Sequence, residues 1–342
     1  MNFASDNTAG ASPAIVAALA AAAGAGRAMP YGNDDLSRGV ERRLAELFET
    51  EVAVFPVATG TAANSLALAA MTPPHGAIYC HADSHIQQDE CGAPEMFTGG
   101  AKLVPLAGAG GKIAAGDLER ALAKAGIGVV HHVQPAALSL TQATEAGTVY
   151  RPDEVAALAD IAHRHAMGVH MDGARFANAL VSLNAAPADL TWRAGVDALS
   201  FGATKNGAFA AEAVLLFKPD LARAFAFRRK RAGHLFSKMR FLTAQLDAYL
   251  ADDHWLANAR HANAMARRLA DGLGAIGGLA LVHPVEANEL FVTMPDPTIE
   301  GLMKAGFQFY RWDGQVCRLV TAFDTQAAHV DAFVEHARRL TA

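Results

Sequence analysis

The chain has 342 residues, of which 52% are hydrophobic and 18% are charged, with a formal net charge of -5 at pH 7. This length can bury a core for one large and one smaller domain, and this composition excludes a disordered chain. The acidic balance provides no basic surface for nucleic acid and no polybasic patch for an anionic membrane, so neither is expected as a partner.

The N-terminal residues 1–12 are predicted to form an extended arm, because polar residues interrupt any periodic pattern there. A helix is expected to begin at Ser12-Pro13, with the proline in its first turn, and to continue through the alanine-rich run 15–25. That run is too short to span a bilayer and follows no basic segment of the kind that opens a signal peptide. Residues 36–49 have leucine and valine at helical spacing, which predicts a second helix.

Short apolar runs then alternate with helical patterns as far as residue 217. The predicted strands are residues 52–57, 77–80, 102–106, 128–133, 168–171, 198–201 and 213–217. Residues 151–166 are typical of the helices between them, with Pro152 near the start and apolar residues along one face. This alternation predicts an α/β fold with a mostly parallel central sheet flanked by helices, and a ligand site at the carboxyl ends of the strands.

After about residue 220 the pattern changes to long helices followed by short strands. The predicted helices are residues 221–250 and 255–273, and the predicted strands are residues 279–283, 289–292, 307–311 and 316–320. A smaller C-terminal α+β domain is expected there. We therefore divide the chain into an arm (1–15), a large α/β domain (16–235) that contains the expected ligand site, and a small C-terminal domain (236–342).

Three segments carry groups suited to one cofactor. Lys205 follows the strand 198–201 in a turn of small residues, where partial burial would favour the neutral amine that forms a Schiff base. Asp172 ends the strand 168–171, where a carboxylate can hold a protonated pyridine nitrogen. Thr59-Gly60-Thr61 precedes a helix, whose first N–H groups can bind phosphate.

Each of these features alone has an ordinary explanation, since a lysine in a turn is usually a surface cation and an aspartate there often caps a helix. Their combination, in this order along the chain, predicts a site for pyridoxal 5'-phosphate (PLP).

Longer blocks around these residues make the sequence resemble the low-specificity L-threonine aldolase family, including its phenylserine-cleaving members. The matching blocks are Tyr31-Gly32-Asn33-Asp34, residues 58–64, His85-Ile86 with Glu90 and Gly92, residues 170–175 and residues 201–207. The similarity extends from residues 5–7 to residues 318–321. It implies the aspartate-aminotransferase-like fold type I, PLP as cofactor, and retro-aldol cleavage of a β-hydroxy-α-amino acid to glycine and an aldehyde.

The resemblance also implies roles for residues in cofactor binding. Lys205 would carry the cofactor, and Asp172 would pair with its ring nitrogen. His85 would stack on the ring, with Arg175 near the phenolic oxygen. The phosphate would be bound by Gly60 and Thr61 and, from a neighbouring subunit, by Arg231.

The substrate carboxylate would be held by Ser5 and Arg318, with Tyr31 contributed across a subunit interface. A homodimer or homotetramer with shared active sites is therefore expected. The sequence departs from the family at Glu145, which stands where some members have a histidine in an Asn-Thr-His segment. The base that accepts the β-hydroxyl proton could be His85, Glu145 or an ordered water.

Other functions remain alternatives at this point. The histidine pairs His81/His85, His131/His132 and His163/His165, with His170 near Asp172, suggest a metal-dependent hydrolase, but no H-E-x-x-H motif is present, and no metal is expected. A non-catalytic binding protein would leave Lys205, Asp172 and Arg318 unexplained. Within PLP chemistry, a β-eliminating lyase, a racemase or a transaminase could use the same fold.

Cysteine usage favours a reducing compartment. The three cysteines, Cys80, Cys91 and Cys317, are widely spaced and form no C-x-x-C pair. They indicate neither a disulfide framework nor a zinc site, and a cytoplasmic location is expected.

Overall fold

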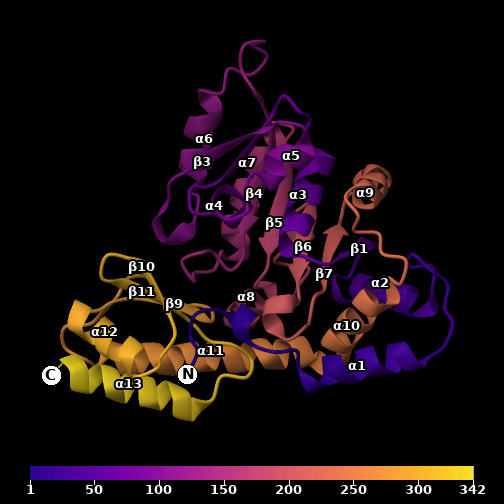
Figure 1. Ribbon diagram of the computed structural model, residues 1–342. Coiled ribbons are helices and arrows are strands. Elements are labelled where there is room, and N and C mark those ends of the chain that lie inside the picture. The colour runs from indigo at the N-terminus through magenta and orange to yellow at the C-terminus, as the bar shows by residue number, and fades with distance from the viewer. Residues whose placement is uncertain (342) are drawn as a thin grey trace.

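A seven-stranded sheet forms the centre of the larger part of the molecule (Figure 1). The computed structural model describes residues 1–341. The strands are β1 (Ala53–Val57), β2 (Gly76–His81), β3 (Lys102–Leu106), β4 (Gln134–Thr141), β5 (Gly168–Gly173), β6 (Ala198–Gly202) and β7 (Glu212–Leu216), in the order β1-β7-β6-β5-β4-β2-β3. The five strands from β3 to β6 are parallel, and only β7 runs against its neighbours. This confirms the predicted α/β fold with a mostly parallel sheet.

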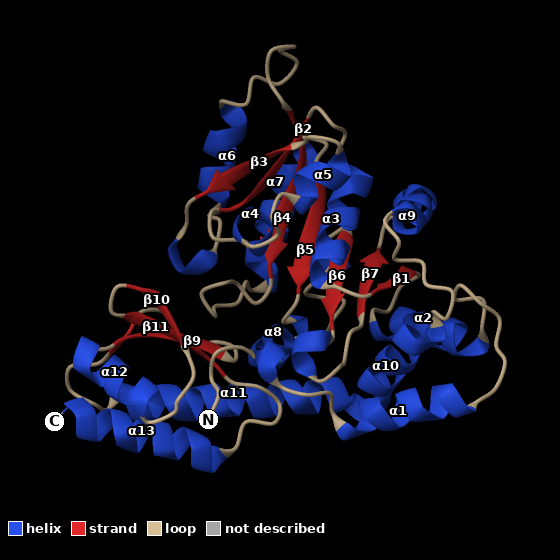
Figure 2. Cartoon of the chain, in the orientation of Figure 1, coloured by secondary structure: helices blue, strands red, loops and turns tan. Residues whose placement is uncertain are grey.

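Helices cover both faces of this sheet (Figure 2). The helices of the larger part are α1 (Pro13–Gly24), α2 (Asp35–Leu47), α3 (Gly60–Met71), α4 (His85–Gln88), α5 (Ala93–Thr98), α6 (Ala115–Ala123), α7 (Pro152–Arg164), α8 (Phe176–Leu183), α9 (Pro219–Arg231) and α10 (Arg240–Leu250). Alternate residues of β7 contribute to separate hydrophobic clusters on the two faces of the sheet, because successive side chains of a strand point to opposite faces. Leu215 packs with Phe176 of α8, whereas Val214 packs with Leu66 of α3.

A second core lies around a four-stranded antiparallel sheet. Its elements are α11 (His254–Gly274), β8 (Ala280–Leu281), β9 (Glu289–Thr293), α12 (Asp296–Lys304), β10 (Tyr310–Asp313), β11 (Val316–Val320) and α13 (Ala327–Thr341), with strand order β10-β11-β9-β8. The N-terminal arm belongs to this core, since Phe3 is buried in it and the Phe3 amide donates to the Gln308 carbonyl at 2.7 Å. The arm therefore lies in the smaller part of the molecule, as does the last helix, α13 (Figure 1).

Helix α10 and the first turns of α11 contribute to the larger core. Tyr249 and Trp255 pack against Phe201, with ring centroids 6.0 and 5.6 Å from it. The domain division at residue 235 remains a prediction, and these contacts connect the two sides of that division.

Some predicted elements are wrong in position. Residues 128–133 form no strand, because Gly126 and Gly128 adopt positive φ angles in a turn, and Val130 is 93% exposed. The strand begins at Gln134, whose side chain accepts the Gly128 N–H at 2.8 Å. The predicted helix 221–250 is two helices, α9 and α10, separated near Gly233.

The small sheet also differs from its prediction. β8 has only two residues, and the predicted strand 307–311 begins at Tyr310, because Phe307 and Phe309 are buried in the second core instead of pairing along a strand. Within residues 1–341, no helix has both the length and the apolar character needed to cross a membrane.

Candidate active site

Two adjoining cavities lie at the carboxyl ends of β4, β5 and β6. The inner cavity has a volume of about 280 Å³ and the outer cavity about 610 Å³. Both are lined by the same five residues, Asn7, His85, Glu145, Arg175 and Lys205. The inner cavity adds the predicted residues Gly60, Thr61 and Asp172, and the outer cavity adds Ser5 and Arg318. The structure thus brings all the predicted site residues together except Tyr31 and Arg231.

Asp172 and Lys205 reach the inner cavity from neighbouring parallel strands. β5 and β6 pair with Asp172 opposite Ser200, and Lys205 lies in the 3-10 turn that follows β6. The strand ends approach closely here, since a Cβ on Gly202 would lie 2.6 Å from the carbonyl oxygen of Ala174. Small residues in the turn therefore allow the lysine and the aspartate to share one cavity.

A buried hydrogen-bond network holds Asp172 and His85. The two Asp172 carboxylate oxygens accept the Ala174 N–H at 3.0 Å and the Asn64 side-chain amide at 2.7 Å. The same Asn64 nitrogen donates to Glu90 Oε1 at 2.8 Å, and His85 Nδ1 donates to that oxygen, also at 2.8 Å.

The network also sets proton affinities. Burial raises the pKa of the Glu90 carboxyl, and the hydrogen bond from His85 to Glu90 raises the pKa of the imidazole. His85 is thereby favoured in its protonated form.

The start of α3 forms the other end of the inner cavity. Thr59 caps the helix by accepting the Ala62 N–H at 3.2 Å, while the earlier amides of Gly60 and Thr61 lie before any intrahelical acceptor. A Cβ on Gly60 would meet no atom within 4 Å, so this side of the turn is open space. Free amides and the helix dipole make this end suitable for an anion.

A tight loop after β4 positions Glu145 between the two cavities. The Thr144 amide donates to the Thr148 carbonyl at 2.9 Å, and the Gly147 φ of +75° allows the loop to approach β9, where a Cβ would lie 2.4 Å from the Glu289 carbonyl oxygen. Glu145 Oε1 accepts the His85 backbone N–H at 3.1 Å. Burial raises the pKa of the Glu145 carboxyl to about 7.

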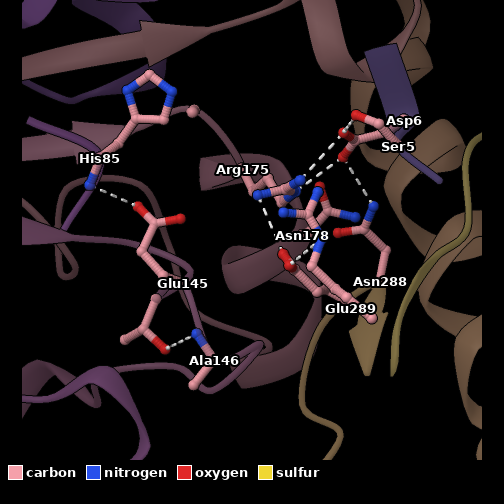
Figure 3. A network of polar contacts seen from close by, with 12 residues as sticks. Ser5, Asp6, His85, Glu145, Ala146, Arg175, Asn178, Asn288 and Glu289 are labelled. Atoms are coloured by element: carbon pink, nitrogen blue, oxygen red, sulfur yellow. Dashed lines mark hydrogen bonds and ion pairs between the residues drawn. The ribbon is translucent and has the colours of Figure 1, made fainter. Parts of the chain in front are cut away.

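A chain of alternating charges crosses from the arm to the small sheet (Figure 3). Arg175 donates to both oxygens of Asp6 at 2.8 and 3.1 Å, and its other nitrogen lies 3.2 Å from Glu289. Arg318 Nε lies 3.0 Å from the second oxygen of Glu289 as an ion pair. Although burial opposes it, the charge of Arg175 holds the pKa of Asp6 below its usual value.

Comparisons with known proteins agree with this geometry. The sequence model of the family described as beta-eliminating lyase matches residues 2–297. The low specificity L-threonine aldolases of Pseudomonas aeruginosa and of a Pseudomonas species are 44% and 42% identical over 330 residues, each covering 96% of this chain and 94% of the relative. The chain belongs to the low-specificity L-threonine aldolase family. The solved structure of Leishmania major threonine aldolase, 28% identical, superposes with a TM-score of 0.93 over 100% of this chain and 99% of that one.

Threonine aldolases are PLP-dependent, which confirms the predicted cofactor and the predicted fold type I. The inner cavity fits this group, because the α3 start offers amides for a phosphate, Asp172 offers a carboxylate for a ring nitrogen, and Lys205 offers an amine. The individual roles of these residues remain predictions.

The outer cavity of this family member has an aromatic wall. The Phe291 and Trp312 rings meet edge to face with centroids 5.7 Å apart, and His283 contacts Phe291 in the same way. The Arg318 guanidinium lies over the Trp312 and Tyr310 rings, 5.1 and 5.6 Å from their centroids. Stacking holds the guanidinium in place while it lines the outer cavity.

Tyr31 and Arg231 lie away from both cavities of their own chain. Tyr31 is exposed, with the ammonium of Lys230 above its ring at 5.0 Å, and Arg231 is exposed at the end of α9. Their predicted role in the site of a neighbouring subunit stays a prediction.

Several of the histidines considered as metal ligands have other partners. His170 is buried between Ser139 and Ser200, whose hydroxyls lie 2.9 and 3.0 Å from its two ring nitrogens, and burial lowers its pKa to about 4. His163 pairs with Asp197 at 3.1 Å. In the described part of the chain, no three His, Cys, Asp or Glu side chains are grouped so that they could hold a metal ion.

Several polar residues of the site were not predicted from the sequence. Asp6, Asn64 and Glu289 hold the predicted residues in place, and Glu212, which lines the inner cavity, accepts the Ala203 N–H at 3.0 Å and has its pKa raised to about 7 by burial. A glutamate that opens the apolar run 289–292 was the available signal, because a carboxylate in a buried strand needs a partner.

Proposed function

We propose that this protein cleaves L-threonine, L-allo-threonine or a related β-hydroxy-α-amino acid, such as phenylserine, to glycine and an aldehyde. One observation carries the proposal: the inner cavity with Lys205, Asp172 and the α3 N-terminus shares five lining residues with the outer cavity that contains Arg318. A cofactor site and a carboxylate-binding group are thus adjacent. The family relationship supports the same activity.

Each part of the site has a proposed task. Lys205 carries the cofactor, Asp172 pairs with its ring nitrogen, and Gly60 and Thr61 bind its phosphate. His85 and Arg175 contact the ring. When bound, PLP supplies an electron-accepting ring that stabilises negative charge on Cα of the substrate.

Arg318 and Ser5 hold the substrate carboxylate. A guanidinium binds a carboxylate through two parallel hydrogen bonds, which fixes the direction of the Cα substituents. Which bond at Cα breaks depends on that direction. With the Cα–Cβ bond aligned for cleavage, loss of the β-hydroxyl proton gives an aldehyde, and protonation at Cα then gives glycine.

Product analysis tests the function. Purified protein with PLP is incubated with L-threonine, L-allo-threonine, phenylserine and their D-isomers, and glycine and aldehyde are measured. Equal amounts of the two products are expected from at least one L-substrate. Pyruvate or another keto acid with ammonia would instead identify a β-eliminating lyase or transaminase, and a D-amino acid would identify a racemase.

We also propose a homodimer or homotetramer in which Tyr31 and Arg231 complete a neighbour's site. Mixing Lys205→Ala protein with Arg231→Ala protein should then restore activity, because half of the sites in a hybrid dimer have both residues. Mixtures no more active than the two variants alone would contradict shared sites.

A cytoplasmic location is proposed from the three free cysteines.

A further inference from the structure

Glu145 lies at the junction of the two cavities and lines both of them. One carboxylate oxygen, Oε1, accepts the His85 backbone N–H at 3.1 Å. The other oxygen, Oε2, has no hydrogen-bond donor within residues 1–341 and is not closed off from the cavities. Figure 3 shows it directed away from the His85 bond, with no interaction drawn to it. Glu145 is therefore a fixed carboxylate with one free oxygen in the site.

His85 is the competing candidate, but its contacts suit a different task. Its Nδ1 donates to the buried Glu90 carboxylate at 2.8 Å, and Glu90 in turn is fixed by Asn64. Because this bond raises the pKa of His85, the imidazolium form, which has no lone pair to accept another proton, persists to higher pH than for a free histidine.

We infer that Glu145, and not His85, is the catalytic base that accepts the β-hydroxyl proton of the substrate. This inference rests on the proposed retro-aldol function. In the step, the O–H bond breaks and its electron pair forms the C=O bond of the aldehyde, while the proton moves to Glu145 Oε2. The Cα–Cβ electron pair stays on Cα, which later takes up one proton to become glycine. One proton is removed and one is added, so the reaction needs no oxidant or reductant.

The surroundings of Glu145 support this role. Burial raises its pKa to about 7, against the attraction of Lys205 and Arg175 and together with repulsion from Asp172 and Glu289. A carboxylate with this pKa accepts a proton more readily than an exposed glutamate and can release it again near neutral pH.

The matched variant is Glu145→Gln, whose amide oxygen can still accept the His85 N–H. We expect its kcat for aldehyde release to fall at least about 100-fold, in the range usual for loss of a general base. The wild-type rate should rise with pH through about 7, and this rise should be lost in Glu145→Gln. Glu286→Gln is the control, because Glu286 also accepts a backbone N–H of this loop, from Val149 at 2.8 Å, but lines neither cavity. It should keep both the rate and the pH profile.

Two further measurements separate a catalytic role from a structural one. Exchange of the glycine Cα proton with deuterium, followed by NMR, needs no β-hydroxyl base and should persist in Glu145→Gln within about threefold. In cofactor-free protein, Glu145 and Glu212 should both contribute infrared carboxyl bands that titrate near pH 7, and the difference spectrum between wild type and Glu145→Gln should show the loss of one of them.

Two outcomes would overturn the inference while leaving the proposed function intact. One is that Glu145→Gln releases aldehyde with the same kcat as the wild type. The other is that Glu145→Gln loses glycine exchange to the same extent as cleavage, because its effect would then not be confined to the step that removes the β-hydroxyl proton. Failure of the wild type itself to form aldehyde and glycine would instead contradict the proposed function.

Discussion

The inner and outer cavities are built in different ways. Strand ends and the turns that follow them line the inner cavity, all between residues 58 and 212 apart from Asn7. The outer cavity joins the arm at Ser5, the segment 83–89 and the small sheet at residues 282–318. A parallel sheet collects the first set at one edge by its topology. The second set requires the N-terminal arm and the small C-terminal sheet to pack together.

The forces that hold the two cavities also differ. Hydrogen bonds through Asn64 order the inner carboxylates, whereas ion pairs among Asp6, Arg175, Glu289 and Arg318 join the outer elements. All four of those side chains are largely buried. Removing one member of such a chain leaves a charge without its partner, so substitutions there affect geometry as well as binding. We therefore expect substitutions in the inner cavity to change the binding and absorption of the cofactor. Substitutions in the outer cavity should change the KM for the substrate.

Lys205→Ala should have the largest effect. If Lys205 carries the cofactor, the purified variant loses both aldolase activity and the visible absorption of the bound cofactor, together with the borohydride-sensitive change in that absorption. Absorption spectra and a product assay measure this. A variant that kept the band unchanged would place the cofactor on another amine.

Arg318→Ala should have the next largest effect and a different character. We expect kcat/KM to fall about 100-fold, mainly through KM, because loss of one partner of a buried charge pair costs about 2–5 kcal/mol. The cofactor absorption should stay as in the wild type, since Arg318 lines only the outer cavity. Arg318→Lys keeps the positive charge but cannot form the two parallel hydrogen bonds of a guanidinium. Its kcat/KM should lie between the values of the wild type and Arg318→Ala. A lost cofactor band in Arg318→Ala would show that the two cavities are not separable.

Much of the fold and the inner cavity could be predicted, because the signals are local. A buried run followed by small residues predicts a strand and a turn, and Asp172 and Lys205 stand directly after such runs. The wrong strand at residues 128–133 followed from reading Val129 and Val130 as buried, although glycines on either side of Ile127 indicate a turn.

The ion-pair chain could not be predicted from spacing. Asp6 and Glu289 are separated by most of the chain, and nothing in their spacing links one to the other. Only tertiary packing decides that Arg175 lies between them. Resemblance supplied Ser5 and Arg318, but the structure was needed to find what holds them.

Glu90→Gln tests the inner network with a smaller expected effect. The hydrogen bond from His85 to a charged acceptor becomes a neutral one, a loss of about 1.5 kcal/mol or about tenfold in kcat/KM. The pKa of His85 should fall, because the Glu90 carboxylate is the main cause of its raised value. A histidine NMR titration should show the midpoint moving to lower pH. An unmoved midpoint would mean that Glu90 does not set the charge of His85.

Trp312→Leu should have the smallest effect and tests how firmly the outer cavity holds its arginine. The Arg318 guanidinium lies 5.1 Å from the Trp312 ring centroid, a contact that contributes about 0.5–1 kcal/mol at a partly exposed site. KM for threonine should therefore rise about two- to fivefold, with kcat and the cofactor absorption unchanged. Trp312→Phe retains a ring and should lie closer to the wild type. The Tyr310 ring stacks on the same guanidinium at 5.6 Å. The Trp312→Leu, Tyr310→Leu double variant should therefore raise KM further than Trp312→Leu alone. If neither changed KM, the ion pair with Glu289 alone would be sufficient to orient Arg318.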